Sequence, residues 1–143
     1  MDELLGQVVM EFGVLLFKSV GLLKDKGNIF FKMGVVPLAY FHYKIALKFL
    51  LLMGTPINYD KPSATCLALS LFLNLAACDL KTPDYEQVSW YCTLILYVDP
   101  SNVKALYRRG LAFKHLNILP KAVADFECAL KINPHNKDIS REL

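Results

Sequence analysis

Two cations stand four residues apart, Lys104 and Arg108, in the stretch NVKALYRRG. If this stretch is a helix, both side chains leave the same face, because four residues make slightly more than one turn. Such a face can bind carboxylates, since lysine offers a point charge and arginine a planar fork of donors. Arg109 would point elsewhere on the helix. Two cations on one helix face are usually solvated, so the interpretation depends on what else shares that face.

Three further residues could complete a site of this chemistry. Lys24 and Asn28 are again four residues apart, in LLKDKGNIFF, and Asn74 precedes Arg108 by 34 residues. The amide group of asparagine can donate to a carboxylate or a peptide without adding charge repulsion. These residues can act together only if the elements that carry them recur at a fixed spacing.

A spacing of 34 residues does recur. Pro100 in YVDPSN and Pro134 in KINPHN are 34 residues apart and share one frame of neighbours. This period is the length of a helix-turn-helix unit of the tetratricopeptide repeat (TPR), and the segment 103–136 resembles the pattern of that family. Small and aromatic residues stand where the two helices of a repeat must approach closely: Gly110, Phe113, Ala122, Phe126, Ala129 and Pro134.

Two earlier segments fit the same frame with departures. The segment 69–102 keeps the small residue and the proline, Ala76 and Pro100, but departs at Asp79, Val88, Cys92 and Ile95. The pattern reappears from Val20 onward, at Gly27, Phe30, Ala39, Tyr43 and Ala46. Residues 20 and 69 are 49 apart, which is 34 plus 15. The first repeat, about 20–68, must therefore carry an insertion of about fifteen residues near 51–65.

The sequence thus predicts an all-α fold, a right-handed α-α superhelix of three TPR units with an incomplete C-terminal capping helix. We expect an apolar lead-in helix over 1–18 and a TPR domain over 19–143, with repeats two and three at 69–102 and 103–136. The expected helices are 16–33, 36–53, 64–81, 84–97, 101–116 and 119–132, followed by the start of the capping helix over 137–143.

In a stack of TPR units, the first helix of each repeat lines a concave groove. Five residues resemble, one by one, the carboxylate clamp of co-chaperone TPR domains: Lys24, Asn28, Asn74, Lys104 and Arg108. In that family the clamp binds the C-terminal Glu-Glu-Val-Asp (EEVD) tail of the 90-kDa and 70-kDa heat-shock chaperones. The resemblance implies a cytoplasmic co-chaperone or adaptor that binds such a tail with about micromolar affinity. Lys81 would be a secondary contact to an upstream glutamate.

The resemblance narrows further. The insertion in the first repeat and the motifs LFLNLAAC and NVKALYRRGLAF are similar to the TPR regions of FKBP-type immunophilins and of aryl-hydrocarbon-receptor-interacting proteins. A prolyl-isomerase domain does not fit within these residues. The sequence also lacks nucleophile-elbow, zinc-protease and phosphate-loop motifs. We therefore expect a protein-interaction module and not an enzyme, without a cofactor.

Composition excludes several other classes. Of 143 residues, 55% are hydrophobic and 20% charged, which argues against disorder. The net charge of +3, without a basic block, argues against nucleic-acid binding. The apolar run Ala64–Cys78 is shorter than the roughly 18–20 residues that span a membrane, and no basic leader indicates secretion. The four cysteines form no CxxC pair, so we expect buried, reduced thiols and no metal site.

One apolar stretch is not explained by the repeat pattern. The second helix of repeat two is apolar almost all round, and a single repeat cannot bury four of its large residues: Trp90, Tyr91, Leu94 and Tyr97. Either the lead-in segment packs over them, or they form a second interface for self-association or for another protein. The alternative function is therefore a TPR scaffold whose main ligand is another protein, bound on the convex face or at the N-terminal segment.

Overall fold

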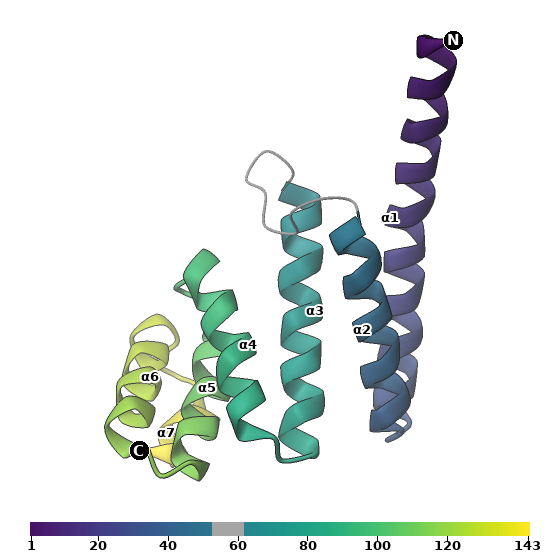
Figure 1. Cartoon of the computed structure of the whole chain (residues 1–143). Helices are drawn as coiled ribbons and strands as arrows, with labels where there is room; N and C mark the ends of the chain where they lie inside the picture. Colours follow the sequence, from purple (N-terminus) through teal and green to yellow (C-terminus); the bar gives the residue numbers. More distant parts are fainter. Residues whose placement is uncertain (53–61) are drawn as a thin grey trace. The chain divides into compact units, whose positions relative to one another are not determined.

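The computed structural model describes residues 1–52 and 62–143, and these hold seven helices and no strand. The helices are α1 (Asp2–Lys32), α2 (Val36–Leu52), α3 (Pro62–Lys81), α4 (Tyr85–Val98), α5 (Val103–His115), α6 (Leu119–Ile132) and α7 (Lys137–Glu142) (Figure 1). The all-α expectation is confirmed, and the helix bounds lie close to those that the repeat pattern predicts. Most of the insertion expected near 51–65 lies outside the described residues.

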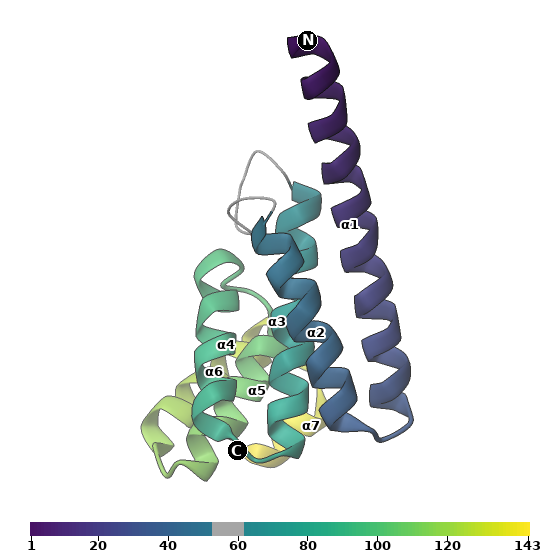
Figure 2. The same ribbon diagram turned by 45° about the vertical axis from the view of Figure 1, so that its right-hand side comes forward.

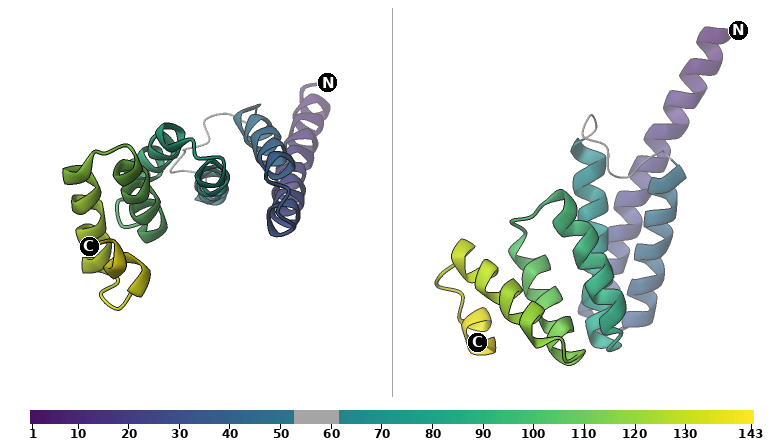
Figure 3. Two further views of the ribbon diagram at one scale, coloured as in Figure 1. Left: turned by 90° about the horizontal axis from the view of Figure 1, so that it is seen from below. Right: turned by 60° about the vertical axis from the view of Figure 1, so that its left-hand side comes forward.

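The chain divides into two compact units, Met1–Leu71 and Phe72–Leu143. In the first unit, α1 and α2 form an antiparallel hairpin, and the N-terminal part of α1 extends past the end of α2 (Figure 2). In the second unit, α4, α5, α6 and α7 pack in chain order, each against the next (Figure 3).

The lead-in segment is not a separate helix. Residues 2–32 form one continuous helix of 31 residues, and every residue from Met1 to Phe12 is exposed. No proline interrupts this stretch, and glycines such as Gly6 and Gly13 cost a helix only about 1 kcal/mol each. The expected boundary at residue 18 therefore does not coincide with a helix end.

The first helix of a repeat ends in the same way in repeats one and three. Gly34 and Asn117 occupy the same repeat position, and both have a positive φ, of 80° and 62°. In each case the next backbone N–H donates to a carbonyl five residues back, Val35 to Phe30 and Ile118 to Phe113. This is the Schellman arrangement, which suits glycine and asparagine because they tolerate the left-handed region.

The close approach of paired helices depends on two glycines. A Cβ built on Gly27 would lie 2.5 Å from Cε1 of Tyr43, and one on Gly110 would lie 2.5 Å from Cε1 of Phe126. The rings of Tyr43 and Phe126 are each only 2% exposed. Each aromatic ring thus lies directly over a glycine backbone, which is the packing expected from the small and aromatic positions of the repeat.

Side-chain caps define the starts of the later helices. Asn102 begins α5 by accepting a hydrogen bond from the backbone N–H of Ala105 at 3.0 Å, and Asn136 begins α7 by accepting one from Ile139 at 3.2 Å. Asp84 caps α4 in the same manner. These caps satisfy donors that the first turn of a helix leaves unpaired. Both asparagines follow the proline that marks the repeat period, so the period also sets the helix starts.

By length and composition alone, two helices among the described residues could span a membrane, α1 and the Ser63–Lys81 part of α3. The length argument made from the run Ala64–Cys78 is therefore wrong, because α3 is 20 residues long. Ala68, Leu71 and Leu75 of α3 are fully buried within the protein, as in the core helix of a soluble domain.

Candidate carboxylate-binding site

The α5 helix carries four cations, and they fall into two kinds. Arg109 pairs with Asp125 of α6, and Lys114 pairs with Glu142 of α7, each at 2.7 Å. Lys104 and Arg108 have no carboxylate within 4.0 Å among residues 1–52 and 62–143. The two cations singled out from the sequence are thus the two whose charges are not met by an acidic side chain of the described chain.

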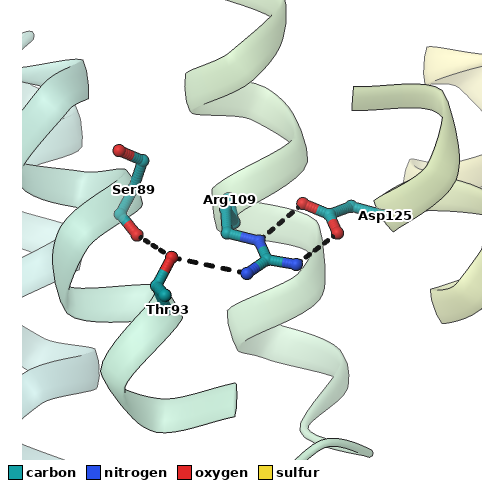
Figure 4. Close-up of polar contacts among 4 residues, drawn as sticks. All are labelled: Ser89, Thr93, Arg109 and Asp125. Carbon is teal, nitrogen blue, oxygen red and sulfur yellow. Dashed lines mark hydrogen bonds and ion pairs between the residues drawn. The ribbon is translucent and has the colours of Figure 1, made fainter. Parts of the chain in front are cut away.

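Arg109 is engaged on the opposite side of α5. Its Nε and one terminal nitrogen donate to both oxygens of Asp125, at 2.8 and 2.7 Å, and its other terminal nitrogen donates to Thr93 of α4 at 3.4 Å (Figure 4). Thr93 in turn donates to the carbonyl of Ser89. Arg109 therefore points away from Lys104 and Arg108, as the sequence predicts, and it links α4, α5 and α6.

Arg108 is half-buried and held against α3. One of its terminal nitrogens donates to the backbone carbonyl of Leu73 at 2.8 Å. Asn74, the next residue, is also half-buried, so the guanidinium lies against the turn of α3 that carries Asn74. Burial lowers the pKa of Arg108, yet an arginine keeps its charge in proteins. With five N–H donors, the group can bind further acceptors while it holds this carbonyl.

The remaining candidates of the second unit are exposed. Lys104 lies one turn before Arg108 near the start of α5, with an exposed side chain. Lys81 is exposed in the last turn of α3, seven residues after Asn74.

Lys24 and Asn28 lie on α1, one turn apart and both half-buried. Lys24 has no carboxylate within 4.0 Å among the residues that the structure describes. The side-chain oxygen of Asn28 accepts a hydrogen bond from the hydroxyl of Tyr43 on α2, at 2.7 Å. The five clamp candidates therefore form two sets, one in each unit of the chain.

Two of the four cysteines are buried and two are exposed, so the expectation of four buried thiols is wrong for Cys66 and Cys128. Burial raises the pKa of Cys92 to about 12, although Arg108 and Arg109 act in the opposite direction. Burial and the neighbouring Asp79 raise the pKa of Cys78 to about 11. Both buried thiols are therefore protonated at neutral pH. No group of three or more metal-ligating side chains occurs in the described ranges.

The apolar face of α4 is only partly exposed. Tyr97 is 83% exposed and Trp90 55%, whereas Tyr91 is 1% exposed and its ring lies against that of Phe72. Leu94 is half-buried. Tyr91 therefore belongs to the core and has to be removed from the candidate second interface, because the helix turns its ring inward.

Two contacts at the site were not foreseen from the sequence, Tyr43 with Asn28 and Arg109 with Asp125. The first could have been found, because repeat one combines a tyrosine at the aromatic position with a polar residue directly after the glycine. The second joins two ordinary surface-type residues 16 positions apart, and no spacing rule singles it out.

Comparison with known proteins identifies the repeats. The tetratricopeptide repeat model matches residues 103–136. The human peptidyl-prolyl cis-trans isomerase FKBP4 is 33% identical over 122 residues, which cover 85% of this chain and 27% of that protein. The chain thus spans about a quarter of the length of this curated relative.

Solved structures agree with the sequence comparison. The C-terminal TPR-containing domain of a Plasmodium falciparum putative FK506-binding protein is 31% identical, with a TM-score of 0.80 over 88% of this chain and 84% of that one. Two RPAP3 structures also match. The first TPR of Spaghetti (RPAP3), bound to the HSP90 peptide SRMEEVD, is 27% identical, with a TM-score of 0.72 over 88% of each chain. The second TPR domain of human RPAP3, in complex with the HSP70 peptide SGPTIEEVD, is 31% identical, with a TM-score of 0.70 over 92% of this chain and 94% of that one.

The helix pairs, the glycine–aromatic contacts at repeat positions and these matches lead to one assignment. The chain belongs to the tetratricopeptide repeat family and is homologous to the TPR region of FKBP-type proteins.

Proposed function

We propose that this chain is a non-catalytic interaction module that binds the free C-terminal tail, of the EEVD type, of cytosolic 90-kDa or 70-kDa heat-shock chaperones. It would act as a cytoplasmic co-chaperone or adaptor. Peptides that end in EEVD are bound by the matched RPAP3 domains, which supports this ligand class.

The observation that carries the proposal is the division of the cations on α5. Two of them are neutralised by acidic residues of the chain, and Lys104 and Arg108 are not. A half-buried arginine without an acidic partner is costly unless a ligand supplies the negative charge. The terminal residue of an EEVD tail supplies two carboxylates, one from its side chain and one from the chain terminus.

Each candidate has a separate role in this proposal. Arg108 offers its remaining donors to a carboxylate or to peptide carbonyls of the tail. Lys104 and Lys24 act as point charges for the two carboxylates. The amides of Asn28 and Asn74 orient the terminal residue, and Lys81 meets an upstream glutamate. Joining the residues of α1 with those of α3 and α5 into one clamp is part of the proposal.

The affinity follows from a few charge-assisted bonds. Each contributes about 1.5–3 kcal/mol net, and the ordering of a flexible tail subtracts from their sum. A dissociation constant near micromolar is therefore expected. Removal of one cation should weaken binding about ten- to hundredfold.

The test is a titration of a peptide ending in Glu-Glu-Val-Asp into the protein and three alanine variants. Lys104→Ala and Arg108→Ala should each weaken binding by that factor. Lys131→Ala, an exposed lysine on α6, is the matched control and should bind like the wild type. If all three variants bind equally well, the clamp assignment is wrong. Thermal melts show whether Arg108→Ala, which also loses the bond to Leu73, remains folded.

A second candidate function is supported by the exposed apolar side chains of α4. Trp90 and Tyr97 form an apolar surface on the second helix of repeat two, on the side of a TPR unit away from the groove. A protein partner bound there, or at the exposed N-terminal part of α1, would make the chain a scaffold. Replacing Trp90 and Tyr97 by serine should then abolish capture of that partner and leave peptide binding intact.

A further inference from the structure

The aromatic residue of repeat one carries a hydroxyl group that the corresponding residue of repeat three lacks. Tyr43 packs over Gly27, and Phe126 packs over Gly110, with the same closest distance of 2.5 Å to a Cβ built on the glycine. Both rings are 2% exposed. Packing alone is therefore achieved by a phenyl ring, and the hydroxyl of Tyr43 is not needed to fill the space between the helices.

The hydroxyl of Tyr43 reaches the residue that directly follows the glycine. It donates to the side-chain oxygen of Asn28 at 2.7 Å. In repeat three the residue after the glycine is Leu111, which offers no acceptor in its side chain. In repeat two the aromatic position is Cys92, and the residue after the small Ala76 is Ala77. A hydroxyl at the aromatic position thus occurs in the one repeat that places a polar side chain within its reach.

This hydrogen bond fixes the orientation of the Asn28 amide. The last torsion of asparagine is broad, so a free side chain samples both orientations of its oxygen and nitrogen. With the oxygen held by a buried hydroxyl, the nitrogen and its two N–H donors are directed to the opposite side of the amide. Donors that are oriented before the ligand arrives avoid part of the ordering cost of binding.

We propose that Tyr43 is a positioning residue for peptide binding: its hydroxyl holds the Asn28 amide with its nitrogen turned to donate to the terminal carboxylate of the bound tail. The proposal rests on the carboxylate-clamp function and adds to it a residue of the second helix that does not itself touch the peptide. The glycine before Asn28 belongs to the same device, because a side chain at residue 27 would displace the ring.

The experiment is a double-mutant cycle on binding of a peptide that ends in Glu-Glu-Val-Asp. Tyr43→Phe should weaken binding about three- to tenfold, the worth of one hydrogen bond. In the Asn28→Ala background the same change should have no further effect, since no amide remains to be oriented. Tyr85→Phe removes a hydroxyl from a ring stacked on His115 in the other unit and is the matched control. An equal loss from Tyr43→Phe in both backgrounds, or no loss in either, would overturn the proposal.

A second measurement needs no peptide. In the free protein, the side-chain amide resonances of Asn28 should shift in Tyr43→Phe and stay in place in Tyr85→Phe. Unchanged resonances in Tyr43→Phe would overturn the positioning role, whatever the protein binds. Shifted resonances in a protein that binds no tail peptide would instead overturn the clamp function, and with it the ligand assigned to the oriented amide.

Discussion

Gly110 offers the sharpest test of how the helices pair. In Gly110→Ala the new Cβ would lie 2.5 Å from Cε1 and 2.9 Å from Cδ1 of Phe126, whereas carbon atoms in contact lie about 3.5–4.0 Å apart. The ring would have to move by about 1 Å within a cluster that includes Leu106, Ala129 and Ile139. Overpacking of this kind costs about 1–3 kcal/mol, and the better helix propensity of alanine returns about 1 kcal/mol. We expect a net loss of about 1–2 kcal/mol in the free energy of unfolding.

The control is a glycine in a similar helical setting but with free space. A Cβ on Gly21 of α1 meets no atom within 4 Å, so Gly21→Ala should gain about 0.5–1 kcal/mol from propensity alone. Urea unfolding, followed by helical circular dichroism, measures both changes. The two substitutions are chemically identical and are predicted to have opposite signs. A Gly110→Ala protein as stable as the wild type would refute the close-contact explanation.

Three further predictions concern the rest of the structure. Arg109→Ala leaves the carboxylate of Asp125, which is 7% exposed, without its partner and should cost about 3 kcal/mol of unfolding free energy; a double replacement of Arg109 and Asp125 by leucine that is no more stable than Arg109→Ala would argue against this. In the folded protein, a thiol reagent at pH 8 should modify Cys66 and Cys128 quickly and spare Cys78 and Cys92, because burial raises the pKa values of these two thiols to about 11 and about 12; the folded pKa values lie above the ordinary value of 9.0, so their contribution to stability is complete below pH 9 and is lost as the pH rises toward 11 and 12. Deletion of residues 1–12, all exposed, should change the unfolding free energy by less than about 0.5 kcal/mol, and a large loss of stability on deletion would show that this end of α1 packs on the domain.

The fold could be predicted from the sequence because the repeat pattern reports packing directly. Glycine and an aromatic residue 16 positions apart, as in Gly110 and Phe126, describe one ring lying on one backbone, and the structure shows that contact. The helix starts followed from the same period, since Asn102 and Asn136 cap α5 and α7. These features are local, and local patterns are what a period detects.

The errors arose where the outcome depends on more than the period. The break expected at residue 18 needed a helix-stopping residue, and the sequence before Lys32 contains no proline. Tyr91 was placed in an apolar surface because its helix is apolar on all sides, a case in which the hydrophobic pattern does not mark the buried face. Its burial follows from the direction of its ring toward Phe72.

Of the candidate site, the sequence supplied the residue types and their repeat positions but not the bonds that hold them. The bond of Arg108 to the Leu73 carbonyl joins residues 35 positions apart, and it involves a backbone atom, which no residue pattern reveals. The pairing of Arg109 with Asp125 explains why one of two adjacent arginines is structural. The other is left with charge to offer a ligand.

The most direct test of the central claim compares two peptides that differ only at the terminus. Calorimetric titration with a heptapeptide ending in Glu-Glu-Val-Asp should give a dissociation constant near micromolar at low salt. The same peptide with an amidated terminus loses one of the two carboxylates and should bind about ten- to hundredfold more weakly. Equal affinity for the two peptides, or no binding of either, would contradict the clamp.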